Sequence, residues 1–120
     1  MKNQTNPITT ITRNLGSNRG KTRLWLEGAC LSSQGWHVGD LFTPLFQNGV
    51  ITYIKGDAGG QSPEKSRRVA GTSSRPIIDT NTDRITDSLE AGKGQQANVE
   101  VSAKRIIITR FNGTNPNYSA

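Results

Sequence analysis

Apolar side chains in this chain occur in short clusters, and each cluster ends at a residue that favours turns. The cluster at 23–27 sets three large apolar residues between charged ends, which predicts a strand that Gly28 terminates. Residues 29–34 predict a helix of one or two turns with Leu31 facing inward, and Gly35 ends it. The first pattern is therefore a strand followed by a short helix.

The next two apolar clusters predict a hairpin. Residues 41–46 form its first strand, in which Pro44 indicates an edge position or a bulge. Residues 50–55 return as the second strand. Asn48-Gly49 lies between them and tolerates the positive φ angles of a tight turn.

The second half of the chain repeats this order. Residues 75–79 predict a strand, 83–89 a helix, and 98–101 with 105–109 a second hairpin. Aligning Gly39 with Gly92 superposes the two copies, with these further matches: Leu24-Trp25 on Ile77-Ile78 and Trp36 on Leu89.

One such unit cannot bury its apolar faces alone, whereas two units that interleave their hairpins can close a small barrel. We therefore expect a mainly β fold with short helices, a barrel made of two strand–helix–strand–strand units. The units span about 22–56 and 75–110, and a basic loop joins them. Trp25 and Trp36 are expected to pack in the core.

The segments 23–28 and 35–40, together with Leu31, resemble the opening of SymE-like proteins, which belong to the AbrB/SpoVT/MazE superfamily of swapped-hairpin domains. The second resembling unit comprises residues 76–79, 89–92, 99–101 and 106–108. Similar two-unit segments occur with phage DNA cytosine methyltransferases. The resemblance covers about residues 22–110 and implies nucleic-acid binding by basic residues on one face of a swapped-hairpin barrel.

The two ends of the chain lack a core pattern. Residues 1–21 carry basic residues and no acid, which predicts a flexible basic arm, and 112–120 predict a disordered tail. Cys30 is the only cysteine, so no intramolecular disulfide is expected. With no signal-peptide pattern and no long apolar run, we expect a cytoplasmic protein of a bacterial or phage-infected cell, away from membranes.

Charge adds an expected partner. The formal net charge is +6 and the sequence pI is about 10.0, which favours nucleic-acid phosphates, with DNA expected ahead of RNA. The candidate phosphate contacts belong to the arm, the central loop and the last hairpin. They are Arg13, Arg19, Lys21 and Arg23; Lys65, Arg67, Arg68 and Arg75; and Lys104 and Arg105.

Catalytic patterns are weak by comparison. His37 is the only histidine and lies in a turn, and Cys30 has no base beside it in the sequence. The acidic residues between 79 and 90 have the spacing of a solvated helix face. We therefore expect no enzyme, no cofactor and no metal site.

Three functions remain open from the sequence. The first is a non-catalytic nucleic-acid-binding module for regulation or targeting. The second is a phage or mobile-element accessory or inhibitor subunit that docks on a larger nucleic-acid enzyme or ribonucleoprotein. The third is a SymE-like toxin that acts on RNA. The oligomeric state stays open between monomer and homodimer.

Overall fold

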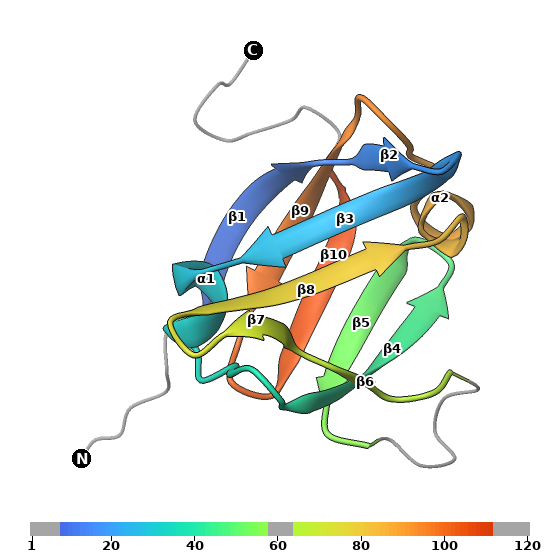
Figure 1. Cartoon of the computed structure of the whole chain (residues 1–120). Coiled ribbons are helices and arrows are strands. Elements are labelled where there is room, and N and C mark those ends of the chain that lie inside the picture. The colour runs from blue at the N-terminus through green and yellow to red at the C-terminus, as the bar shows by residue number, and fades with distance from the viewer. Residues whose placement is uncertain (1–7, 58–63, 112–120) are drawn as a thin grey trace.

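The computed structural model describes residues 8–57 and 64–111 (Figure 1). Within these residues the chain forms two antiparallel sheets and two short helices, which confirms the expected mainly β class. The elements of the first half are β1 (Thr9–Asn14), β2 (Gly16–Asn18), β3 (Lys21–Glu27), α1 (Ala29–Ser32), β4 (Leu41–Gln47) and β5 (Val50–Lys55). Those of the second half are β6 (Arg67–Arg68), β7 (Ala70–Thr72), β8 (Arg75–Asn81), α2 (Arg84–Leu89), β9 (Gln96–Val101) and β10 (Arg105–Phe111).

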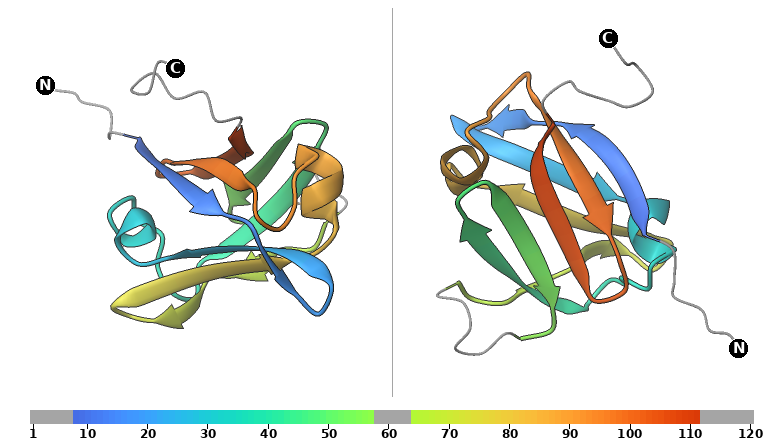
Figure 2. Two further views of the ribbon diagram at one scale, coloured as in Figure 1. Left: turned by 90° about the horizontal axis from the view of Figure 1, so that it is seen from above. Right: turned by 180° about the vertical axis from the view of Figure 1, so that it is seen from behind.

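The strand order shows that the two halves follow one plan. Sheet A runs β1-β9-β10-β5-β4-β6, and sheet B runs β2-β3-β8-β7. Strands β1 to β5 of the first half correspond in turn to β6 to β10 of the second half. If each strand is exchanged for its counterpart, both strand orders are reproduced in reverse. Accordingly, the two helices lie at opposite ends of the molecule (Figure 2). The chain therefore contains an internal repeat with a two-fold arrangement.

The register of the repeat differs from the one expected from sequence. Strands β3 and β8 have the same alternation of buried and exposed residues, which matches Leu24 with Ile78 rather than Ile77. The expected alignment was therefore wrong by one residue here, and such a slip would have put each side chain on the opposite face of the sheet. The same comparison matches Gly39 with Gly94, since both have positive φ, and Trp36 with Ala91.

Each hairpin pairs with the other half of the chain. The hairpin β9–β10 pairs with β1, the hairpin β4–β5 pairs with β6, and β5 pairs with β10 at the centre of sheet A. The hairpins are thus exchanged between the halves, so neither half completes sheet A alone. Pro44 in β4 lies opposite Tyr53, beyond the two residues that pair with β6, where no ladder donor is needed.

Two corners join the sheets. At Leu15, between β1 and β2, the N–H donates to the Gln95 carbonyl at 2.8 Å and the carbonyl accepts from Gly94 at 3.1 Å. At Val69, between β6 and β7, the N–H and carbonyl bond to Asp40 and Gly39, each at 2.8 Å. Because loops rather than strands make these bonds, the ladder is interrupted and the described residues form two sheets. The expected closed barrel is corrected accordingly.

The basic arm expected at 1–21 is also corrected. Residues 9–14 form β1, 16–18 form β2, and Lys21 already belongs to β3. Leu15 is buried at 2% exposure and Ile11 packs against the core, so these two apolar residues attach the polar stretch to the core. Residues 1–7 and the tail expected at 112–120 lie outside the described residues.

The core lies between the sheets and is closed at its ends by the helices. Trp36 is fully buried, as expected, and donates through Nε1 to the Ser102 carbonyl at 2.7 Å. Trp25 was expected in the core but is 38% exposed. It alternates with the buried Leu24 and Leu26 on β3, so it must face away from the core.

Candidate nucleic-acid interface

The candidate phosphate contacts separate onto the two sheets. Sheet B and its turns carry Arg19, Lys21, Arg23 and Arg75. Sheet A and its connections carry Arg13, Lys65, Arg67, Arg68, Lys104 and Arg105. Lys21 and Arg75 begin antiparallel strands and therefore lie at opposite ends of sheet B. The arm, loop and hairpin of the sequence do not form one patch.

Five of the basic residues gather at one end of sheet A. Arg105 on β10 lies opposite Ile54 on β5, and Lys104 accepts a backbone bond from Lys55 at 3.0 Å. Across β4, Leu41 lies opposite Arg68 on β6. The turn between β9 and β10 and strand β6 lie at the same end of the molecule in both figures (Figures 1 and 2). We call this group the cationic end of sheet A; its members are Lys65, Arg67, Arg68, Lys104 and Arg105.

The cationic end retains its charge. Arg68 donates through Nη1 to the backbone carbonyl of Gly39, at 3.0 Å. Lys65, Lys104 and Arg105 are exposed. None of the five forms an ion pair with any acid among residues 8–57 and 64–111. Strands β10 and β6 are separated by three inter-strand spacings, which puts them about 14 Å apart. The positive charge is therefore spread over a width that can span several phosphates.

The outer face of sheet B has a different character. Arg23 donates through Nε and Nη2 to the two carboxylate oxygens of Asp79, both at 2.9 Å, and this bonding raises the pKa of Arg23. Arg75 lies 3.4 Å from Glu27. The guanidinium of Arg23 also sits 4.7 Å from the centre of the Trp25 ring, whose Nε1 donates to Glu27. This face combines an exposed indole with two arginines, Arg23 and Arg75, that pair with acids.

Two further cations, Lys55 and Arg110, were absent from the candidates. Lys55 Nζ donates to the Gly35 carbonyl at 2.7 Å, and Arg110 donates to the Glu90 carbonyl at 3.2 Å. Gly35 and Glu90 both have positive φ at the end of the helical turns in their halves. Cations at helix C-termini stabilise the exposed carbonyls. The repeat itself is the signal that could have identified these two residues, since they occupy matching positions.

The remaining candidates for chemistry are separated from one another. Cys30 is half-buried, and burial raises the pKa of its thiol. The backbone N–H of His37 donates to Asp40 Oδ2 at 2.8 Å, and the imidazole lies on an exposed residue. In the part of the chain that the structure describes, no three His, Cys, Asp or Glu side chains are grouped so that they could hold a metal.

Arg13 lies on β1 at the position that matches Arg67 on β6, and it donates to the carbonyl of its neighbour Thr12 at 3.1 Å. Arg19 has a φ of 56° in the turn between β2 and β3. Neither belongs to the cationic end of sheet A.

Comparison with family models, curated proteins and solved structures found no match to this chain. Among the described residues, neither helix is long or apolar enough to cross a membrane.

Proposed function

We propose that this protein is a non-catalytic nucleic-acid-binding module, acting in regulation or targeting, that holds phosphates on the cationic end of sheet A. The observation that carries the proposal is that Arg68 lies at the same end of sheet A as Lys104 and Arg105, from distant parts of the sequence, and that none of them forms an ion pair with an acid among residues 8–57 and 64–111. Cations that bind phosphate release condensed counterions, which supplies affinity without base contacts.

The dimensions of the group suit a nucleic-acid backbone. A separation of about 14 Å between β10 and β6 matches about four nucleotide steps at 3.4 Å each. Arginine offers a planar fork of donors for phosphate oxygens, and three of the five residues are arginines. Duplex DNA is the proposed ligand, with RNA as the competing nucleic acid.

The exchanged hairpins support the resemblance to the AbrB-like superfamily. In our proposal the chain is a single-chain form of a swapped-hairpin domain, because each hairpin pairs with the first strand of the other half. A second copy of the chain is then unnecessary for completing the sheets.

The test is fluorescence anisotropy of a labelled duplex at several salt concentrations. We expect Arg68→Ala/Lys104→Ala/Arg105→Ala to weaken binding at least ~10-fold and to lower the slope of log K against log salt by about 2.7, for three lost phosphate contacts. Arg19→Asn/Lys21→Ala/Lys93→Ala removes the same charge from exposed positions elsewhere and should change affinity much less.

Equal losses of duplex affinity in the two triple variants would show that net charge alone determines binding. That result would overturn the assignment of binding to this surface. Absence of salt-dependent binding by the unmodified protein would overturn the function. An RNA probe in the same series separates DNA from RNA binding, and cleavage of that probe would favour the RNA-acting toxin instead.

One observation favours a second function, as an accessory subunit that docks on a larger nucleic-acid enzyme. Trp25 is exposed at the centre of a face whose arginines are paired with acids, and buried Trp and Arg are the residues that most often dominate protein interfaces. A partner recovered stoichiometrically from the native host, and lost with Trp25→Ala, would support docking. Recovery of nucleic acid alone by both forms would count against it.

A further inference from the structure

The turn at residues 37–40, between α1 and β4, is attached to both parts of the cationic end of sheet A. Before the turn, the indole of Trp36 donates to the Ser102 carbonyl at 2.7 Å, in the β9–β10 turn that carries two of the cations. Within the turn, the Gly39 carbonyl accepts from Arg68 Nη1 at 3.0 Å. The two residues between Trp36 and Gly39 therefore lie between the two groups of cations.

The backbone of this turn is fixed by its own residues. The Asp40 N–H donates to the His37 carbonyl at 3.0 Å, and the His37 N–H donates to Asp40 Oδ2 at 2.8 Å. Gly39 supplies the positive φ, 92°, that such a turn needs. Consecutive Cα atoms are about 3.8 Å apart, so the Cα of His37 lies within about 8 Å of that of Gly39. The imidazole is thus an exposed group beside the cations.

The second half of the chain builds the same turn without a histidine. The Gln95 N–H donates to the Gly92 carbonyl at 2.9 Å, and the Gly92 N–H donates to Gln95 Oε1 at 3.0 Å. These bonds match the two that join His37 and Asp40, so Gly92 occupies the position of His37 in the repeat. Because the bonds form without a side chain at this position, the imidazole of His37 is not needed to hold the turn.

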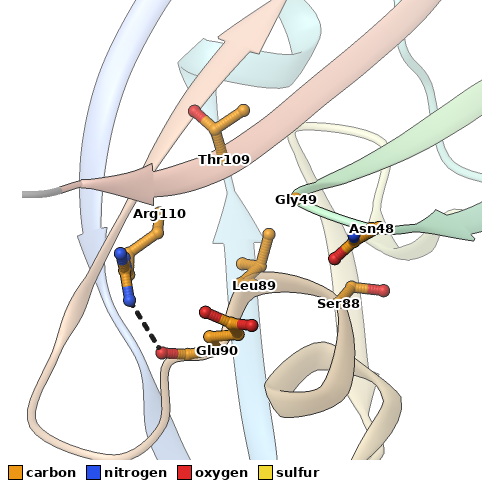
Figure 3. A pocket seen from close by; sticks show the side chains of 7 residues that line it. All are labelled: Asn48, Gly49, Ser88, Leu89, Glu90, Thr109 and Arg110. Carbon is orange, nitrogen blue, oxygen red and sulfur yellow. Dashed lines mark hydrogen bonds between the residues drawn. The ribbon is translucent and has the colours of Figure 1, made fainter.

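The cations that the two halves share bind the helix ends in both. Arg110 donates to the Glu90 carbonyl at 3.2 Å (Figure 3), and Lys55 donates to the Gly35 carbonyl at 2.7 Å. Since these two residues play one structural role, a functional difference between the matching turns has to come from side chains that differ. In the turn of the first half, His37 is the residue that can gain a positive charge.

The charges around the turn determine the sign of the effect. The charged groups on the surrounding elements are of both signs; they are Asp40 within the turn, Lys55 on β5 with Asp57 after it, Arg68 on β6, and Lys104 and Arg105 on the β9–β10 turn. Cations outnumber acids in this set, so a proton on His37 adds charge to a positive surface. A bound phosphate stabilises that added charge, so protonation and duplex binding favour each other.

We propose that His37 contacts a nucleic-acid phosphate as an imidazolium, so that the cationic end of sheet A binds a duplex more tightly as the pH falls. This inference rests on the proposed function and adds a proton-dependent contact to the same site. Histidine changes its charge between pH 5 and 8, and His37 is the only histidine of the chain. A pH dependence in that range can therefore be assigned by substituting one residue.

The test is fluorescence anisotropy of the labelled duplex at pH 5.5 and 7.2, each at several salt concentrations. We expect the unmodified protein to bind at least ~3-fold more tightly at pH 5.5, with the slope of log K against log salt steeper by up to about 0.9, for one further phosphate contact. His37→Gln should show neither change. His37→Lys, whose charge is permanent, should bind at pH 7.2 about as tightly as the unmodified protein binds at pH 5.5.

A matched control moves the histidine to the second turn. A Cβ at Gly92 would meet its nearest atom, Thr86 Oγ1, at 3.6 Å, so a side chain fits there. The connection from α2 to β9, which contains Gly92, lies at the opposite end of the molecule from that between α1 and β4 (Figure 1). His37→Gln/Gly92→His should therefore bind as His37→Gln does at both pH values. A restored increase in affinity at pH 5.5 would overturn the assignment to the turn at 37–40.

The remaining outcomes separate this inference from the proposed function. Salt-dependent binding by the unmodified protein that does not change with pH would overturn the role of His37 and leave the proposed function standing. The same holds if His37→Gln retains the full pH dependence of the unmodified protein. Absence of salt-dependent binding at both pH values would overturn the proposed function, and the role of His37 with it.

Discussion

The two hairpin tips occupy matching positions in the repeat but carry different chemistry. The β4–β5 tip, Gln47–Val50, has no charge and is bonded to the end of α2. The β9–β10 tip, Ser102–Arg105, carries Lys104 and Arg105 and is bonded to Trp36. Both close as tight turns, since Gln47 lies opposite Val50 and the Ser102 N–H bonds to the Arg105 carbonyl. The backbone plan is shared, and the side chains at the tips are not.

This difference separates residues that serve the fold from residues that serve binding. Lys55 and Arg110 match, and each bonds the carbonyl at its helix end, so they belong to the fold. Arg68, Lys104 and Arg105 match Asn14, Gly49 and Val50, so one half alone bears these charges. Basic residues that only one half carries are therefore the better candidates for function.

The largest expected effect concerns the buried indole of Trp36. Trp36→Ala should lower the free energy of unfolding by about 3–5 kcal/mol, because the indole is fully buried and bonded. At the matching position, Ala91→Gly removes a single methyl group and should cost about 1 kcal/mol. Urea unfolding of both variants measures the contrast. Similar losses would show that the halves contribute to the core alike.

A smaller effect distinguishes the halves by pH. Burial raises the pKa of Tyr53 to about 12, and the matching residue Ile108 cannot titrate. Because the folded pKa lies above the ordinary value of 10, stability should be complete below pH 10 and fall by roughly 2–3 kcal/mol as pH rises toward 12. Tyr53→Phe should remove this alkaline decline relative to the unmodified protein. Unfolding midpoints at pH 8 and 11 measure it, and an identical decline in Tyr53→Phe would contradict the assignment.

The smallest expected effect concerns Lys55 and Arg110, which bond the helix-end carbonyls at matching positions in the two halves. Lys55→Met and Arg110→Met should each cost about 0.3–1 kcal/mol, since each removes a cation from a helix end. Lys55→Met should lose slightly more, because Lys55 also lies 3.8 Å from Asp40. Thermal unfolding at low and high salt measures both. A loss in duplex binding with Arg110→Met would instead assign that residue to the interface.

The repeat could be predicted from the order of strand, helix and hairpin, but its register could not. Matching by glycines and large residues paired Gly39 with Gly92, whereas backbone conformation pairs Gly39 with Gly94. Leu15 was missed because isolated apolar residues among polar neighbours produce no clear periodic signal, although the corner at that residue buries it. Trp25 was misplaced because the alignment that was wrong by one residue matched it with Ile78, while its alternation with Leu24 and Leu26 already indicated the outer face.

The candidate site was predictable in part, for a related reason. The basic residues are visible in the sequence, but their grouping depends on which strands are neighbours. Arg68 and Arg105 lie at the same end of sheet A only because both hairpins are exchanged, which places β10, β5, β4 and β6 side by side. The pairing of Arg23 with Asp79 is equally a product of the β3–β8 register. Local sequence cannot reveal either relation.

The most direct test of the account is an amide NMR titration of the full chain with a short duplex at low salt, comparing the two hairpin tips. We expect the largest shifts at residues 65–68 and 103–105, with residues 47–50 nearly unaffected and the response reduced as salt rises. Equal shifts at the two tips, or shifts centred on the outer face of sheet B around Trp25, would contradict the assignment of binding to the cationic end of sheet A.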